Sequence, residues 1–310
     1  MSHLPSSDPA GYLDDLLVRF RPLTDGSING ASEALGDTEP ERFGVALATV
    51  DGQVFGASDD GVQFAIQSIS KPFLYGLALD LFGREKVHAK VAVEPTTEAF
   101  NSLTELEEDH LPYNPMINSG AIAISAMLHH ADPDSASATM MAMLGRYMGR
   151  EATRHPRAVD DVSGAHRNLA IAHLLRHFEV IGDDIVGSMK LYNRQCTATA
   201  NVRELALMAA TLANGGEHPV TDERAIRRDH VGDVLTLMFT CGMYDTSGSW
   251  AYTVGLPAKS GVGGGILAVV PGRMGLAVYS PRLDSHGHSV RAVAALRAWS
   301  ADWNLAMFRL

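Results

Sequence analysis

The chain has 310 residues, of which 46% are hydrophobic and 20% charged, so it has a globular composition and can bury a sizeable core. Its net charge of −11 would repel a polyanion, which argues against nucleic acid as a partner, and no basic amphipathic stretch indicates a membrane surface. Two cysteines, Cys196 and Cys241, supply neither a disulfide framework nor a zinc-binding pair.

The N-terminal part of the chain predicts a helix, a loop and a hairpin in that order. Its first residues lack the pattern of a signal peptide, and residues 12–20 carry apolar side chains at helical spacing. Residues 23–42 are rich in Gly, Ser, Asp, Glu and Pro, which is typical of a loop. A hairpin is expected next, because the strong turn signal Asp51-Gly52 separates two strand-like arms at residues 43–50 and 53–58.

A helical block follows, from Ser68 to about Thr240. It contains four segments with apolar residues every three or four positions: GAIAISAMLHH, ATMMAMLGRYMGR, NLAIAHLLRHF and VRELALMAATLANGG. Strands return in ILAVVPG and MGLAVYSPRL, and an amphipathic helix at about residues 288–305 closes the chain. No apolar run is long enough to span a bilayer, so we expect a cytoplasmic protein with no membrane partner.

This order of elements predicts an α+β fold in a single domain over residues 1–310. Its antiparallel sheet is expected to come from both chain ends, at about 25–67 and 245–310, with flanking helices. A helical subdomain is expected at about 68–244. The crevice between the two parts is the natural place for a ligand.

The strongest local signal is the sequence from Gln67 to Pro72, QSISKP. Ser68 and Lys71 are three residues apart, so one helical turn would bring both to the same face. Inside a helix the Pro72 ring would clash with the carbonyl group of Ser68, so we expect Ser68 at the opening of a helix, where free N–H groups suit an oxyanion. A lysine can activate a serine when burial or a nearby charge lowers its pKa. The bare Ser-x-x-Lys pattern arises easily by chance, and a capping serine beside a surface lysine is its simpler interpretation.

A second signal is Lys259-Ser260-Gly261, which is of the same type as the Lys-Thr-Gly that penicillin-recognising enzymes place on the strand beside their site. The alternative is a flexible glycine loop before a strand. The glycines would also let the backbone approach a substrate closely. A backbone N–H group here could join that of Ser68 in an oxyanion hole.

Six segments spread over residues 43–291 resemble, in order, successive blocks of the serine-dependent glutaminase family: FAIQSISKPF, YNPMINSGAI, RNLAIA, YNRQC with LALMAATLANGG, CGMYDTSGSWAYTVGLPAKSGVGGGILAVVP, and LDSHGHSVRA. The resemblance implies a β-lactamase-like fold and hydrolysis of L-glutamine to L-glutamate and ammonia through a serine acyl-enzyme. It also implies that the reaction needs no cofactor and no metal. A homo-oligomer, either dimer or tetramer, is implied as well, and Trp299 and Trp303 of the last helix are candidates for its interface.

Position within these blocks implies a role for each matching residue. Ser68 matches the nucleophile and Lys71 its base. The residues expected to contact the substrate are Ser68, Asn118, Asp161, Asn168, Tyr192, Tyr244 and Val262. Either tyrosine could protonate the leaving ammonia, and Lys259, Ser260 and Gly261 would support the site.

The sequence departs from the family pattern at two places. Asp161 stands where the family has a glutamate, seven residues before Asn168, so the charge is kept but its reach is shorter. Ala31-Ser32-Glu33 stands where the family usually has Tyr-Ile-Pro, if the alignment has no gap. Both departures concern substrate binding, so we expect either weaker binding of glutamine or a different preferred amide.

Two alternatives remain open from the sequence. One is another acyl-transfer enzyme on the same fold, such as a β-lactamase or a peptidase, although a missing signal peptide argues against it because those substrates lie outside the cytoplasm. The other is a catalytically weak glutamine-binding protein, since fold alone does not imply function. His173 and His177 are four apart on a predicted helix, but no third ligand accompanies them, so we expect no metal site.

Overall fold

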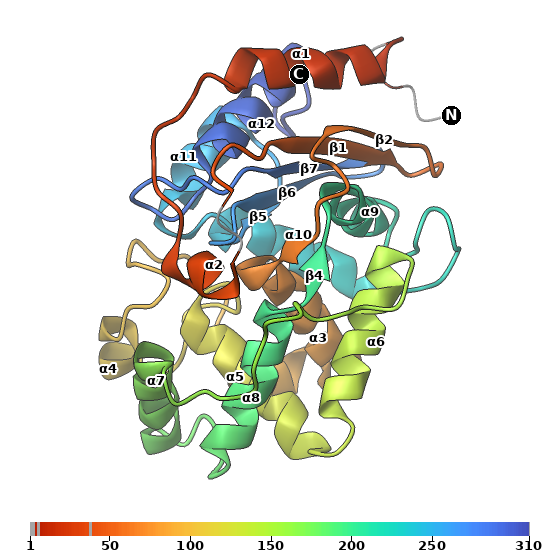
Figure 1. Ribbon diagram of the computed structural model, residues 1–310. Coiled ribbons are helices and arrows are strands. Elements are labelled where there is room, and N and C mark those ends of the chain that lie inside the picture. The colour runs from red at the N-terminus through yellow and green to blue at the C-terminus, as the bar shows by residue number, and fades with distance from the viewer. Residues whose placement is uncertain (1–3, 5–6, 37–38, 310) are drawn as a thin grey trace.

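The computed structural model describes residue 4, residues 7–36 and residues 39–309. Its centre is a five-stranded antiparallel sheet with strand order β2-β1-β7-β6-β5 (Figure 1). The strands are β1 (Gly44–Thr49), β2 (Val54–Ser58), β5 (Ala258–Ser260), β6 (Gly265–Val270) and β7 (Met274–Tyr279). Because β1 pairs with β7, the sheet is built from both ends of the chain, as the sequence predicts. The predicted α+β fold class is therefore confirmed.

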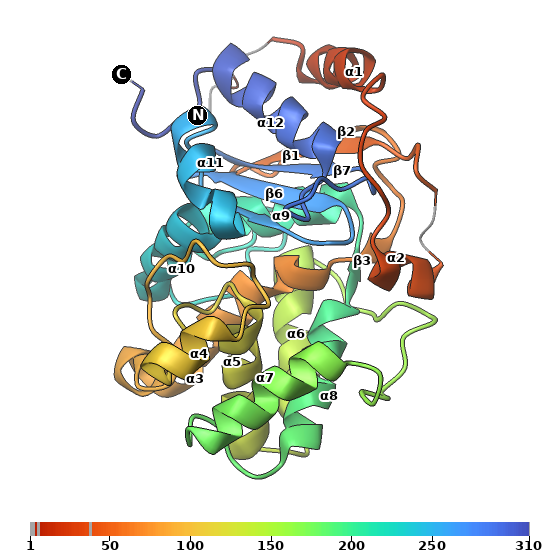
Figure 2. The ribbon, with the colours of Figure 1, turned by 90° about the vertical axis from the view of Figure 1, so that its left-hand side faces the viewer.

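The two faces of the sheet are covered by different helices. One face carries α1 (Pro9–Phe20), α11 (Ser247–Thr253) and α12 (Val290–Asp302), and the other carries α9 (Val202–Ala213) (Figures 1 and 2). Side chains of a strand alternate between the faces, so Val45 and Leu47 of β1 belong to the core under α1 and α12, and Ala46 belongs to the core on the α9 side.

The remaining helices form a block beside the α9 face (Figure 2). They are α3 (Lys71–His88), α4 (Thr104–Asp109), α5 (Asn118–Ala131), α6 (Ala136–Met148), α7 (His166–His177), α8 (Ile185–Cys196) and α10 (Arg228–Cys241). A two-stranded ribbon, β3 (Phe64–Ala65) with β4 (Thr199–Ala200), leads from the sheet into this block. Whether the chain divides into a sheet part and a helical part at the predicted boundaries stays a prediction.

Local expectations are confirmed in most places. The hairpin at residues 43–58 forms, with Gly52 at φ 87° in its turn, and the expected helix at 12–20 begins earlier, at Pro9, where the Asp8 side chain caps it. The expected loop at 23–42 is wrong in part, because it contains the short helix α2 (Gly30–Leu35). Among the described residues, none of the helices is long and apolar enough to cross a bilayer.

The two tryptophans of the last helix do not have the interface role suggested by the sequence. Trp299 is fully buried and Trp303 is 8% exposed. Both rings pack against Tyr12 of α1. The distance from the Tyr12 ring centroid is 5.9 Å to that of Trp299 and 4.7 Å to that of Trp303. The two rings therefore pack α12 against α1 within the core of the chain.

The close approach of α9 to the sheet gives the first prediction. A Cβ atom at Gly275 of β7 would lie 2.2 Å from the carbonyl oxygen of Ala206 and 2.4 Å from the backbone nitrogen of Ala210. Both neighbours are helix backbone, which cannot move aside without displacing α9. Gly275→Ala should therefore lower the free energy of unfolding by about 1–3 kcal/mol or more, as measured by urea denaturation.

Gly232→Ala is the matched control, because Gly232 lies in α10 and a Cβ atom there would meet no heavy atom within 4 Å. This variant should gain about 0.5–1 kcal/mol from helix propensity. Equal stability of the Gly275→Ala variant and the wild type would show that α9 does not pack this closely.

Candidate active site

A cavity of about 490 Å³ lies where the sheet, the helical block and α2 meet. The predicted residues that line it come from six separate segments of the chain: Ser68, Asn118, Asp161, Asn168, Tyr192 and Val262. Lys71, Tyr244 and Lys259 are buried next to this lining. The fold thus brings residues from 68 to 262 to one place.

Ser68 lies in the one-turn 3-10 helix η1 (Gln67–Ser70), and α3 begins immediately after it at Lys71. Pro72 is the second residue of α3, so its missing N–H group is one that the helix start leaves without a partner anyway. Gln67 has φ 50°, a left-handed conformation that is rare for a residue other than glycine. This strained backbone turns the chain from β3 into η1 and sets the position of the Ser68 hydroxyl.

Lys71 is buried and is held by a chain of amide side chains. Its Nζ donates to Oδ1 of Asn118 at 2.7 Å, and Nδ2 of Asn118 donates to Oδ1 of Asn168 at 2.9 Å. Because an ammonium or amine offers N–H groups to the amide oxygen, this chain fixes the orientation of Asn118. Burial lowers the pKa of Lys71 from 10.5 to about 7. Lys71 can therefore be a neutral amine, and so a base, near neutral pH.

Tyr244 is buried, with its ring centroid 5.9 Å from the Nζ of Lys71, and it also has a left-handed backbone, with φ 52°. Its hydroxyl donates to the carbonyl oxygen of Ser260 at 3.4 Å, and its interaction with the Ser68 side chain favours a lower pKa. Burial raises its pKa, so the phenol keeps its proton. The ring of Phe100 rests against it, with centroids 4.8 Å apart.

Lys259 holds Tyr244 from the edge strand β5. Its Nζ lies 3.9 Å from the Tyr244 ring centroid and donates to the carbonyl oxygens of Gly242 at 3.1 Å and Ser260 at 2.7 Å. Burial, together with the nearby Lys71, holds the pKa of Lys259 well below its usual range. Lys259 and Ser260 lie on β5 beside the site, and Gly261 follows directly after the strand.

The second tyrosine, Tyr192 of α8, has a different neighbour. It interacts with the thiol of Cys196, one helical turn further along, and Cys196 also lines the cavity. Burial raises the pKa of both groups. Cys196 and Phe100 were not predicted as site residues from the sequence. The i, i+4 spacing from Tyr192 could have pointed to Cys196, whereas nothing local marks Phe100.

Of the two departures from the family pattern, Asp161 lines the cavity, and residues 31–33 belong to α2, which borders it. Asp161 is exposed, and its carboxylate accepts hydrogen bonds from the backbone and the hydroxyl of Ser163, both at 2.9 Å, which lower its pKa. Helix α2 contains residues 31–33 and contributes Ala34 and Leu35 to the cavity wall. The side chain of Ala31 lies outside the described part of the chain.

Known proteins resemble this chain over nearly its whole length. The glutaminase family model matches residues 26–308. A glutaminase of Microcystis aeruginosa (strain NIES-843 / IAM M-2473) is 45% identical over 300 residues, which cover 96% of this chain and 89% of that protein. The solved structure of the probable glutaminase ybaS has a TM-score of 0.94 at 34% identity, covering 99% of this chain and all of that one. The solved structure of Mglu in its glutamate form has a TM-score of 0.92 at 37% identity, covering 98% of this chain and 71% of that one.

The buried amine of Lys71 gives a prediction about stability. Above pH 7 the unfolded chain holds a proton on this lysine that the folded chain does not, so this group makes stability rise with pH from about 7 towards 10.5. Lys71→Met removes that contribution. The quantity to compare is the free energy of unfolding of the variant minus that of the wild type, measured by urea denaturation. This difference should be roughly 2–3 kcal/mol larger at pH 6 than at pH 9.

The change in this stability difference between pH 6 and pH 9 is the informative quantity, because it cancels the pH-independent loss of the hydrogen bond to Asn118. Lys190→Met, at an exposed lysine of α8, is the control and should show a change of less than about 0.5 kcal/mol at either pH. A pH-independent effect of Lys71→Met would mean that the lysine keeps an ordinary pKa.

Proposed function

The chain belongs to the glutaminase family, and we propose that it hydrolyses L-glutamine to L-glutamate and ammonia through an acyl-enzyme on Ser68. The observation that carries this mechanism is the buried Lys71, whose pKa is lowered to about 7 one turn from a serine that lines the cavity. Serine attacks an amide only after losing its proton, and a neutral lysine is a competent base.

The first step forms the acyl-enzyme. Ser68 Oγ attacks the carbonyl carbon of the side-chain amide as its proton passes to the neutral Lys71. Lys71 donates one of its N–H groups to Asn118, which leaves the lone pair of the neutral amine free to face the serine. The amide chain from Lys71 to Asn168 keeps the base in place during this transfer, so no reorganisation is required.

The oxyanion that forms on the amide carbonyl needs donors. We assign this role to the backbone N–H groups of Ser68 and Val262. Ser68 is in the first turn of η1, where N–H groups have no helical acceptor, and Val262 follows the edge strand in a glycine-rich turn. Among the described residues, none accepts a hydrogen bond from the Val262 N–H group.

Tyr244 is the better placed of the two tyrosines to protonate the leaving group. Its hydroxyl already contacts Ser68 and keeps its proton, whereas Tyr192 is engaged with Cys196. As the C–N bond breaks, the amide nitrogen takes a proton from Tyr244 and leaves as ammonia. Lys71, now an ammonium, returns the proton to the phenolate, and then activates a water that releases glutamate and restores Ser68.

The remaining residues would hold the ends of the substrate. Asn168 offers a neutral amide for the α-carboxylate, and Tyr192 lines the same cavity. Asp161 supplies the negative charge for the α-ammonium, which would otherwise be a costly unpaired charge. Since Asp161 is exposed and already bonded to Ser163, this pairing is weakened by solvent.

The compartment and the oligomeric state of the enzyme are also proposals. We infer a cytoplasmic homo-oligomer. Both cysteines are free and buried, which fits a reducing compartment. An interface is supported by Tyr252, which is 89% exposed, and Phe308, which is 75% exposed, rather than by the buried tryptophans.

The nucleophile is tested by ammonia release from L-glutamine. Ser68→Ala should reduce kcat by roughly 10³-fold or more, because it removes the hydroxyl on which the proposed acyl-enzyme forms. Ser70→Ala is the matched control from the same turn. Within the described part of the chain its hydroxyl bonds only to the Gln67 carbonyl, so the variant should keep most of the activity. Activity that survives in the Ser68→Ala variant would rule out this serine as the nucleophile.

The Asp161 position is tested by substrate preference. Asp161→Glu restores the longer reach, so kcat/KM for glutamine should rise by about 3- to 10-fold, mainly through KM, because the ammonium contact is a binding interaction. The kcat/KM for asparagine serves as the internal comparison and should not rise with it. No gain for glutamine would show that the shorter acid is not what limits binding.

A further inference from the structure

Tyr244, to which we assign the leaving-group proton, lies in a strained turn. It is the first residue of η2 (Tyr244–Thr246), a single 3-10 turn between α10 and α11. Its left-handed φ of 52° is unfavourable for a residue other than glycine unless the surroundings hold it there. The turn therefore needs contacts from outside itself to keep the Tyr244 hydroxyl in place.

Two histidines are bonded to the two residues that follow Tyr244. Nδ1 of His286 lies 2.7 Å from the Asp245 carboxylate, and both side chains are partly exposed. Nε2 of His288 lies 2.9 Å from Oγ1 of Thr246, and this histidine is only 2% exposed. The inner of the two bonds is shielded from water, so it is the stronger constraint on the turn.

The His288 ring also packs on the phenol itself. Its centroid is 5.5 Å from that of Tyr244, and the two ring planes are 12° apart. Phe100 and the Nζ of Lys259 contact the same phenol ring from other segments of the chain. Of these three residues, His288 is the one that is bonded to the turn as well as packed on the ring.

The protonation of His288 follows from its partners. The Thr246 hydroxyl donates its one hydrogen to the carbonyl oxygen of Met243 at 2.7 Å, so it accepts from Nε2–H of His288. Nδ1 has no partner among the described residues, as expected of the nitrogen without a proton. Burial, together with Lys259, lowers the pKa of His288 to about 4, although Asp284 acts the other way. The ring is therefore neutral near pH 7 and does not repel the buried lysine.

His288 is itself held in place. One carboxylate oxygen of Asp284 accepts hydrogen bonds from the backbone N–H groups of His286 and His288, at 2.9 and 3.0 Å. The Asp284 N–H group donates to the carbonyl oxygen of His288 at 2.8 Å, and α12 begins two residues later at Val290. These bonds fix the histidine independently of η2, so it can position the turn rather than follow it.

We propose that His288 is a positioning residue for Tyr244, which holds the η2 turn so that the phenol can give its proton to the leaving nitrogen. This inference rests on the proposed function, in which Tyr244 is the acid. His288 is not among the described residues that line the catalytic cavity. It therefore acts on the reaction through Tyr244, and its loss should lower kcat rather than raise KM.

The first test is ammonia release from L-glutamine by His288→Leu, which removes both the ring and the Nε2–H donor. Its kcat should fall by about 10- to 100-fold while KM stays within about 2-fold, because a displaced acid slows proton transfer without altering binding. His288→Gln can place an amide N–H group near the position of Nε2 and should recover most of the lost kcat. Thr246→Val removes the accepting oxygen and should reproduce the loss, whereas Thr246→Ser keeps the hydroxyl and should not.

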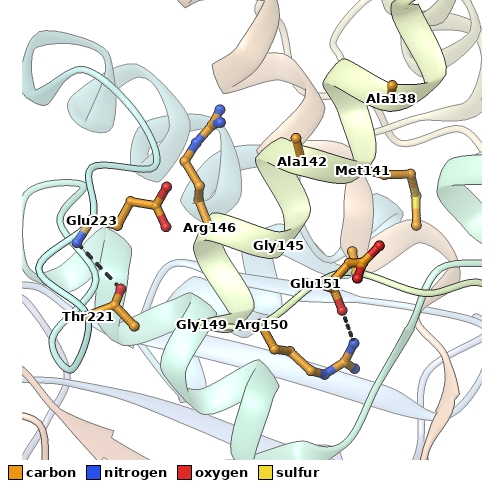
Figure 3. Close-up of a pocket in the computed structure, with 11 residues that line it drawn as sticks. Ala138, Met141, Ala142, Gly145, Arg146, Gly149, Arg150, Glu151, Thr221 and Glu223 are labelled. Carbon is orange, nitrogen blue, oxygen red and sulfur yellow. Dashed lines mark hydrogen bonds between the residues drawn. The ribbon is translucent and has the colours of Figure 1, made fainter.

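His218→Leu is the matched control at another buried histidine. His218 is 1% exposed, and its Nδ1 accepts from the backbone N–H group of Thr221 at 3.1 Å. Thr221 lies in the loop after α9, beside a separate cavity that shares no lining residue with the catalytic one (Figure 3). This variant also loses a buried imidazole and its hydrogen bonds, but it should keep kcat within about 2-fold of the wild type.

Two further measurements separate positioning from a general loosening of the fold. In the Tyr244→Phe background, His288→Leu should lower kcat by less than about a further 2-fold, because the hydroxyl through which it acts is already absent. The acid limb of kcat/KM against pH, expected near pH 7 from Lys71, should keep its place in His288→Leu. A loosened interior would instead let water reach Lys71, raise its pKa and move the limb upward.

A crystal structure of His288→Leu gives a test that does not depend on activity. It should show the Tyr244 hydroxyl displaced from its 3.4 Å contact with the carbonyl oxygen of Ser260. If the wild type released no ammonia, the proposed function would fail, and the position of Tyr244 in this variant would still decide whether His288 holds it. The inference is overturned if Tyr244 keeps its place, if His288→Leu keeps the wild-type kcat, or if the loss is undiminished in the Tyr244→Phe background.

Discussion

The structure of this site depends on the burial of one amine. Lys71 is 1% exposed and has no carboxylate partner among the residues that the structure describes. Its hydrogen bond is to a neutral amide, that of Asn118. A charged ammonium in such a place is unfavourable, so the protein holds the neutral form near pH 7. The neutral form is also the one that can accept the serine proton. Burial therefore sets both the electrostatics and the chemistry.

Lys259 extends the same constraint. It is buried on β5, and the two lysine nitrogens lie 3.9 and 5.9 Å from the Tyr244 ring centroid. Two positive charges near one ring in an apolar interior would repel each other, so Lys71 adds to the burial that lowers the pKa of Lys259. Because Lys259 is bonded to two carbonyl oxygens, it is fixed in position. Tyr244 is held against Ser68 by a rigid strand edge rather than by a mobile loop.

Much of this arrangement follows from local sequence signals. Pro72 places Ser68 in the turn before α3, and Asp51-Gly52 forms the hairpin that begins the sheet. What the sequence did not predict depends on contacts between distant segments. Asn118 and Asn168 are fifty residues apart and meet only in the folded chain. Helix α2 is six residues long, too short to be stable by propensity, so packing at the cavity rim decides its conformation.

The residues that depart from the family pattern lie apart from the residues assigned to proton transfer. Asp161 and α2 lie at the rim, where water screens charges and a side chain can change without disturbing the core. The groups assigned to proton transfer lie in the interior, where a lost hydrogen bond leaves a buried polar atom unsatisfied. Substitution at the rim therefore alters affinity at little cost to stability, whereas substitution in the interior affects both. A chain that keeps its interior and varies its rim can change its preferred amide without altering the serine, lysine and tyrosine to which we assign the reaction.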